Sequence, residues 1–135
     1  MTTAATTTKV PGNHEQFIQR FVAACQADAR VVAAFLGGSY AKGTADTYSD
    51  LDLGLITTDA AYEDFLAGRA AFIRRLGEPV FLEHFGRPNN VFFIFPDGVE
   101  GELVLGRERQ FTDMHGGPYQ VLLDTKDILA GAVFP

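Results

Sequence analysis

The segment 34–57 reads AFLGGSYAKGTADTYSDLDLGLIT and contains the features that decide the fold. A short apolar run at 31–36, which begins with two valines, leads into it and predicts a buried strand. Gly37 and Gly38 end that strand, and Ser39 then stands where the N-cap of a helix would. A helix that begins behind glycines presents unpaired N–H groups and the positive end of its dipole. The segment therefore predicts a cradle for a phosphate group.

A pair of carboxylates follows this cradle. Asp50 and Asp52 alternate with Leu51, Leu53 and Leu55, so a strand here would place both acids on one face and the leucines on the other. Carboxylates at this spacing lie roughly 6.5–7 Å apart along a strand. Mg²⁺ suits such a pair because it takes one or two carboxylates and completes its shell with phosphate oxygens. The two halves together predict a metal-dependent nucleotide site. The plain structural alternative is a turn followed by a solvated strand face.

Two other phosphate-binding motifs do not fit the same residues. Gly38 and Gly43 have the spacing of a P-loop, but Thr44 stands where that loop needs its lysine. A dinucleotide fingerprint would need a third glycine and an acidic residue after the next strand, which this segment does not supply. Neither class of nucleotide site is therefore expected.

The order of these features resembles the nucleotidyltransferase superfamily that includes DNA polymerase beta. Its signature is an apolar strand, Gly-Ser, a short helix, and then Asp-x-Asp in a hydrophobic strand. Gly38-Ser39 and Asp50-Leu51-Asp52 fill those positions, and this version is most similar to the minimal and antibiotic-modifying branches. The resemblance implies that Gly38 and Ser39 bind nucleotide phosphates and that Asp50 and Asp52 hold Mg²⁺ or Mn²⁺. It also implies that Lys42 lies near the triphosphate, although an isolated lysine is equally consistent with a solvated position.

A third acidic residue is expected on a later strand. Pro96-Asp97-Gly98 predicts a hairpin turn into a strand at 99–105, where Glu100 and Glu102 share the face opposite to the apolar residues. Glu100 is nearer the turn and is the more solvated candidate. Similar antibiotic nucleotidyltransferases have Asp-Gly, three residues, and then an acidic residue followed by an apolar one. That pattern implies Glu102 as the third catalytic and metal-binding carboxylate, with Glu100 as the alternative.

The remaining elements complete an α+β prediction. Helical periodicity predicts amphipathic helices at 14–28 and 60–76, with His14 solvated in the first turn and Cys25 on the core side. Strand-like segments lie at 79–85, 90–95 and 119–123. By resemblance this is the polymerase-beta-type fold, a mixed sheet with helices on one face and a hairpin that brings Glu102 beside Asp50 and Asp52.

Composition limits the class of protein. The 135 residues predict one domain at 13–135 after a flexible tail at 1–12. A formal net charge of −6 argues against general nucleic-acid binding, which requires a basic surface. A single cysteine excludes an internal disulfide and favours a reducing cytoplasm. The chain shows no membrane-spanning segment, and residues 1–11 lack the apolar core of a signal peptide.

The resemblance implies an adenylyltransferase that moves AMP from ATP to a hydroxyl group of a small molecule, such as an aminoglycoside-type antibiotic, or of a protein. Larger antibiotic-modifying relatives carry a C-terminal helical domain, which is not expected here. Minimal relatives pair with small helical proteins, so a homodimer or a helical partner is a further expectation. The alternative function is a nucleotide-binding antitoxin or regulatory module that acts by binding such a partner.

Overall fold

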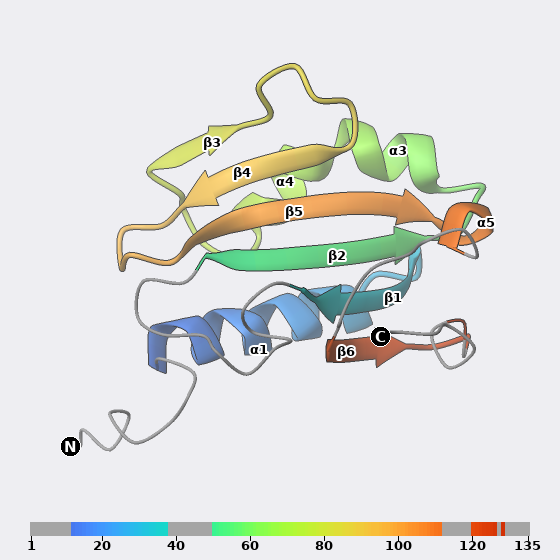
Figure 1. Ribbon diagram of the computed structural model, residues 1–135, viewed down its shortest axis with the longest axis horizontal. Helices are drawn as coiled ribbons and strands as arrows, with labels where there is room; N and C mark the ends of the chain where they lie inside the picture. Colours follow the sequence, from blue (N-terminus) through green and yellow to red (C-terminus); the bar gives the residue numbers. More distant parts are fainter. Residues whose placement is uncertain (1–11, 38–49, 112–119, 127, 129–135) are drawn as a thin grey trace.

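Residues 12–37, 50–111, 120–126 and 128 are described by the computed structural model (Figure 1). Helix α1 (Gly12–Gln26) leads into β1 (Val31–Leu36), and β2 (Leu51–Thr57) follows. Two short helices, α3 (Tyr62–Ala67) and α4 (Arg69–Arg74), come next. The last elements of the described part are β3 (Phe81–Glu83), β4 (Asn90–Ile94), β5 (Glu100–Arg107), α5 (Glu108–Phe111) and β6 (Gln120–Asp124).

The strands form one mixed sheet in the order β3-β4-β5-β2-β1-β6. β2 and β5 run parallel, and the other neighbouring pairs in the described sheet run antiparallel. The parallel pair lies at the centre, although its two strands are far apart in sequence. The predicted α+β class and the predicted hairpin between β4 and β5 are confirmed.

Alternation along the central strands places the core on one face of the sheet. Leu51, Leu53 and Leu55 of β2 are buried, and so are Leu103 and Leu105 of β5. Aromatic rings of the helices cover these leucines. Figure 1 shows α3 and α4 behind the sheet. The ring centroids of Phe17 in α1 and Phe93 in β4 are 5.3 Å apart, those of Phe21 and Phe72 are 6.2 Å apart, and those of Phe65 and Phe72 are 5.1 Å apart. The helices α1, α3 and α4 therefore share one apolar cluster. On the opposite face of the central strands Asp50, Asp52 and Glu100 are exposed, whereas Ile56 near the other end of β2 is buried.

Three expectations from the sequence differ from the structure. The single helix expected at 60–76 is two helices, because Gly68 ends α3 and caps α4. The strand expected at 79–85 is only three residues long. His14, expected to be solvated, is 4% exposed.

The turn at 96–98 packs near the start of α1, where the Asn13 side chain donates a hydrogen bond to the carbonyl of Asp97 (3.2 Å). None of the helices in the described part of the chain is long and apolar enough to cross a membrane.

Cys25 is a core residue, as the sequence predicts. Its side chain is buried in α1, and burial, with a smaller contribution from the nearby Asp28 carboxylate, raises the pKa of its thiol to about 12. The thiolate, which is the reactive form of cysteine, is therefore scarce at neutral pH.

The lack of a side chain at Gly101 in β5 allows the backbone of β2 to approach it closely. A Cβ atom at this position would lie 2.3 Å from the carbonyl oxygen of Leu51, which is backbone and cannot move aside. We expect Gly101→Ala to lower the free energy of unfolding by about 1–3 kcal/mol, the usual effect of overpacking. Urea denaturation measures this change. Gly106→Ala in the same strand is the matched control, because its Cβ would meet only the flexible Ile56 side chain at 3.3 Å. Equal effects of the two substitutions would contradict the close approach at Gly101.

An ion pair with a buried carboxylate lies in the connection between α1 and β1. The Asp28 side chain, 7% exposed, accepts hydrogen bonds from the Arg30 guanidinium at 2.9 and 2.8 Å, and Arg75 lies 3.5 Å away. These hydrogen bonds lower the pKa of the Asp28 carboxyl to about 2. A lowered folded-state pKa stabilises the protein above the unfolded pKa, and this stabilisation is lost as the pH falls toward 2.

We expect Asp28→Asn to lower the free energy of unfolding by about 2 kcal/mol at pH 7, with the difference from wild type shrinking below about pH 4. Denaturation curves at pH 7, 4 and 3 measure it. Asp64→Asn is the control, because the exposed Asp64 also pairs with Arg30 but should contribute under about 1 kcal/mol. A pH-independent difference for Asp28→Asn would contradict this assignment.

Candidate active site

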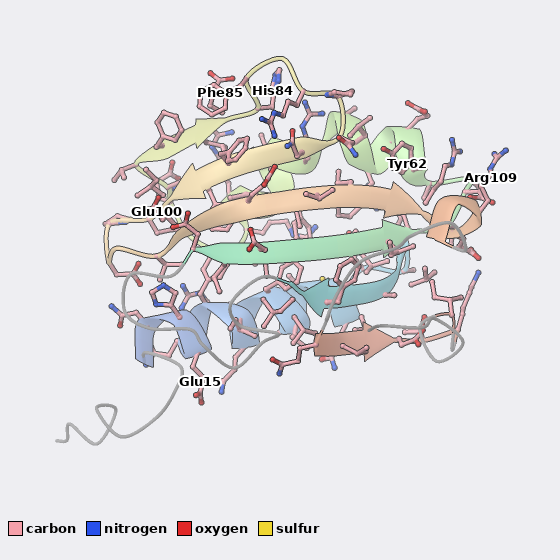
Figure 2. The ribbon with its side chains drawn as sticks, in the orientation of Figure 1. Glu15, Tyr62, His84, Phe85, Glu100 and Arg109 are labelled. Atoms are coloured by element: carbon pink, nitrogen blue, oxygen red, sulfur yellow. The ribbon has the colours of Figure 1, made fainter. Side chains whose placement is uncertain are left out.

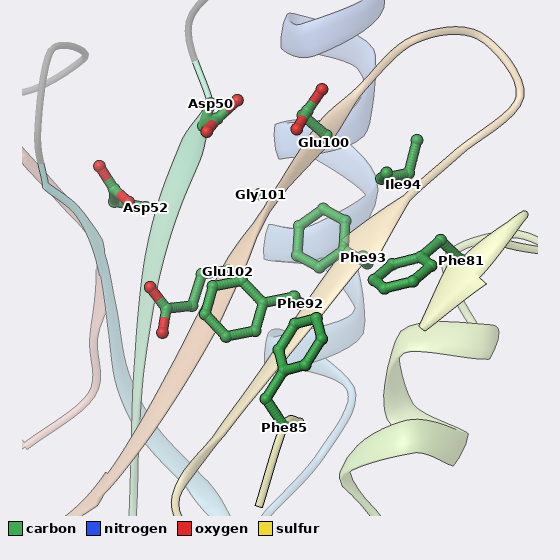
Figure 3. A pocket seen from close by; sticks show the side chains of 10 residues that line it. All are labelled: Asp50, Asp52, Phe81, Phe85, Phe92, Phe93, Ile94, Glu100, Gly101 and Glu102. Atoms are coloured by element: carbon green, nitrogen blue, oxygen red, sulfur yellow. The ribbon is translucent and has the colours of Figure 1, made fainter. Parts of the chain in front are cut away.

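The parallel pairing of β2 with β5 brings acidic side chains together on the open face of the sheet. The register pairs Asp52 with Glu102, and Leu51 with Gly101. Neighbouring strands lie about 4.8 Å apart, and directly paired residues point to the same face. Asp50 comes just before β2, at the level of Glu100. Figure 3 shows these four carboxylates on the same side of the sheet, with helices behind it.

A pocket of about 200 Å³ lies over this face. Carboxylates line one end, and phenylalanine side chains line the other (Figure 3). The acidic end consists of Asp50, Asp52, Glu100 and Glu102, and the apolar end consists mainly of Phe81, Phe85, Phe92 and Ile94.

Asp52 is the carboxylate most affected by these surroundings. Its pKa is raised, first by burial and then by the negative charges of Glu102 and Asp50. Its backbone carbonyl accepts a hydrogen bond of 2.8 Å from the N–H of Gly37, directly after β1. Gly37 is the described residue before the segment 38–49, and Asp50 is the described residue after it. Both flanking residues lie beside the acidic end of the pocket. Gly38, Ser39 and Lys42, the predicted nucleotide-binding residues, lie outside the described residues.

The comparisons with known proteins agree with this arrangement. Residues 18–109 match the nucleotidyltransferase domain family, a match that includes β1, β2 and β5. The chain belongs to this family. The nucleotidyltransferase is similar in fold to an aminoglycoside 6-adenyltransferase from Bacillus subtilis, with a TM-score of 0.50 and 17% sequence identity. The similarity covers 73% of this chain and 35% of that enzyme, so this chain spans about a third of its length. No protein of curated function matches the sequence.

Sequence reasoning missed two residues that contact Glu102. The side-chain amide of Asn90, which is 4% exposed, donates a hydrogen bond to Oε2 of Glu102. The guanidinium of Arg87 lies 3.7 Å from the same oxygen and 5.4 Å from the centroid of the Phe92 ring. Asn90 could have been found from the hairpin register, because it lies two residues from Phe92, the cross-strand partner of Glu102. The position of Arg87 depends on the loop between β3 and β4, which carries no recognisable pattern.

The donor set of this nucleotidyltransferase suits a hard divalent cation. All the candidate ligands are carboxylate oxygens, which Mg²⁺ and Mn²⁺ prefer. Burial and, to a smaller extent, the negative charges of Glu102 and Asp50 raise the pKa of Asp52, and a positive ion would relieve the repulsion between these carboxylates. Among the described residues, no three carboxylate, imidazole or thiolate groups lie close enough together to hold one ion. Asn90 and Arg87 contact Glu102 from the β4 side.

Proposed function

We propose that this nucleotidyltransferase moves AMP from ATP to a hydroxyl group in a reaction that requires Mg²⁺ or Mn²⁺. The observation that carries the proposal is the pairing of Asp52 with Glu102 on adjacent parallel strands, beside the ends of the segment that contains Gly38 and Ser39. This pairing supports a site in which Asp50, Asp52 and Glu102 serve as metal ligands and base at one end of the pocket.

Each residue has a defined role in this proposal. Asp50 and Asp52 hold the metal ion, with Glu102 as a third ligand or as the base. Gly38, Ser39 and Lys42 bind the β- and γ-phosphates through backbone N–H groups, a hydroxyl and an ammonium group. The bound ion supplies charge neutralisation on the triphosphate and lowers the pKa of a coordinated hydroxyl.

The transfer step itself breaks one bond and forms one. The acceptor oxygen attacks the α-phosphorus, the bond from that phosphorus to the bridging oxygen of the β-phosphate breaks, and pyrophosphate leaves with the electron pair. The hydroxyl proton passes to Glu102. Because the Asn90 amide donates to Oε2 of Glu102, the free Oε1 is the oxygen that takes this proton. Asn90 is thereby a positioning residue for the base.

The acceptor is proposed to be a small molecule, such as an aminoglycoside-type antibiotic, or a protein. The name of the structurally similar enzyme from Bacillus subtilis supports the first choice, although the similarity itself concerns the fold. A cytoplasmic location and a homodimer or helical partner protein stay predictions from the sequence.

Calorimetric titration with ATP, with and without Mg²⁺, tests the nucleotide site. We expect heat of binding only with the metal ion. A mass search for AMP-modified acceptors then tests transfer, and an AMP adduct supports the enzyme. Metal-dependent binding with no adduct in any acceptor pool would favour the regulatory module. No ATP binding under either condition would contradict both functions.

A further inference from the structure

Three phenylalanines, of which two are exposed and one is half-buried, form a cluster at the apolar end of the pocket. Phe81 of β3 is 41% exposed and Phe85 of the following loop is 61% exposed. The centroid of the Phe85 ring lies 6.0 Å from that of Phe81 and 5.3 Å from that of Phe92 in β4. We call Phe81, Phe85 and Phe92 the phenylalanine cluster. Figure 2 shows Phe85 and His84 in the loop between β3 and β4, at the outer edge of the sheet.

The backbone of Phe85 is held in a costly conformation. Its φ is +53°, in the left-handed region that bulky residues avoid. The carboxylate of Glu83 accepts hydrogen bonds from the N–H groups of His84 (2.9 Å) and Phe85 (3.2 Å). The N–H of Gly86 donates to Nδ1 of His84 at 3.1 Å. These hydrogen bonds hold the loop with the Phe85 ring 61% exposed, so its contacts with Phe81 and Phe92 offset only part of the cost of the left-handed conformation. Strained residues of this kind concentrate at ligand-binding sites.

The sheet order separates this cluster from the described residues that flank the segment 38–49. Gly37 follows β1 and Asp50 precedes β2, and both of these strands lie on the opposite side of β5 from β3 and β4. The cluster lies over β3 and β4, on the other side. Cross-strand pairs connect the two ends of the pocket, because Phe92 pairs with Glu102, and Ile94 pairs with both Glu100 and Phe81. The pocket therefore runs from the carboxylates over β5 and β4 to the phenylalanine cluster (Figure 3).

In-line displacement decides which substrate approaches from this side. The attacking oxygen and the leaving pyrophosphate lie on opposite sides of the α-phosphorus. With the leaving phosphates on the β1 side, the acceptor hydroxyl arrives from the β5 and β4 side. A pocket of about 200 Å³ accommodates part of a small molecule. Exposed phenyl rings meeting at interplanar angles of 34° and 61° offer both faces and edges to an added aromatic ring.

We propose that the phenylalanine cluster is the acceptor subsite and that it binds an aromatic ring of a small hydroxyl compound. This inference rests on the proposed function and narrows the acceptor from any hydroxyl compound to one with an aromatic ring close to its hydroxyl. An aminoglycoside has no aromatic ring, so within the proposed small-molecule acceptors this subsite favours aromatic alcohols over aminoglycosides. Phe85 is the main contact, because it is the most exposed of the three rings and lies between the other two.

Benzyl alcohol is a suitable probe, and NMR of labelled phenylalanine rings detects its binding. We expect saturable shifts of the Phe81, Phe85 and Phe92 signals, assigned from alanine variants, and none with glycerol at the same concentration. Phe85→Asn should weaken benzyl alcohol binding by about 3- to 10-fold, the range for loss of one aromatic contact. Asparagine tolerates the left-handed conformation, so the melting temperature should stay equal to that of wild type or rise. Val104→Ala, on the same exposed face but outside the pocket lining, should change neither quantity.

Three outcomes would overturn the proposal. No saturable shift in the wild type, or an unchanged affinity in Phe85→Asn, would show that the cluster does not bind the ring. A melting temperature lowered in Phe85→Asn would assign the cluster to local packing. An ATP affinity lowered in Phe85→Asn would assign it to the nucleobase instead. The benzyl alcohol titration is performed with and without Mg²⁺ and ATP. If ATP does not bind the wild type, the proposed function fails, and this result is distinguishable from a failure of the cluster to bind the aromatic ring.

Discussion

Glu102→Gln is expected to lower the rate of nucleotidyl transfer by about 10²–10⁴-fold while most of the affinity for ATP remains. A hydroxyl group is a weak nucleophile at neutral pH and must lose its proton as it attacks the α-phosphorus. Glutamine keeps the shape of glutamate but cannot accept that proton. Single-turnover kinetics with saturating Mg²⁺ and ATP measure the transfer step, and calorimetry measures the affinity.

Glu100→Gln is the matched control, two residues away on the same face of β5. Glu100 is exposed and lies at the level of Asp50, whereas Glu102 is paired directly with Asp52 and contacts Asn90. The control should change neither the rate nor the affinity appreciably. If Glu100→Gln abolishes transfer and Glu102→Gln does not, Glu100 is the base. If neither substitution lowers the rate of transfer, the hydroxyl proton goes to a group outside β5.

Asp52→Asn is expected to abolish metal-dependent binding of ATP, and Asp50→Asn is expected to weaken it severely. Mg²⁺ bound through one or two carboxylates loses its main protein ligand when one of them becomes neutral. The fold should not suffer, because burial and the charges of Glu102 and Asp50 already raise the pKa of Asp52 and disfavour its ionised form. We therefore expect Asp52→Asn to be at least as stable as the wild type in urea denaturation.

Calorimetry with ATP and Mg²⁺ measures the loss, and circular dichroism confirms that each variant is folded. Asp97→Asn, in the turn at 96–98, is the control for a change of charge outside the pocket lining, and its ATP affinity should match that of the wild type. Wild-type affinity in a folded Asp52→Asn variant would contradict the metal assignment.

The central strands β2 and β5 could be predicted because apolar and polar residues alternate along them. The leucines of β2 are buried, Asp50 and Asp52 are exposed, and the apolar residues of β5 face the core as their spacing predicts. The hairpin turn before β5 also fixed which face Glu100 and Glu102 occupy. The family follows from the same residues, because the glycine-serine pair and the two aspartates occupy its signature positions.

Other features depend on contacts between distant parts of the chain. The alternation of residues does not show that β2 and β5 are parallel neighbours, because parallel pairing leaves no turn to recognise. Only the resemblance to the family implied that Glu102 lies beside Asp50 and Asp52. His14 was misassigned because periodicity does not show that the start of α1 contacts a distant part of the chain, where the neighbouring Asn13 side chain donates a hydrogen bond to the carbonyl of Asp97. The break at Gly68 interrupts a helical pattern that periodicity alone would continue. Asn90 and Arg87 acquire their role only when the hairpin and its loop are folded.

Transfer of isotopic label from ATP tests the central claim most directly. The wild-type protein is incubated with Mg²⁺ and with ATP labelled in either the α- or the γ-phosphorus, in the presence of aromatic alcohols, aminoglycosides and proteins as acceptors. Nucleotidyl transfer predicts that the α-label appears on an acceptor, that the γ-label appears in pyrophosphate, and that Asp52→Asn gives neither product. Appearance of the γ-label on the acceptor, or equal labelling by the wild type and Asp52→Asn, would contradict the account.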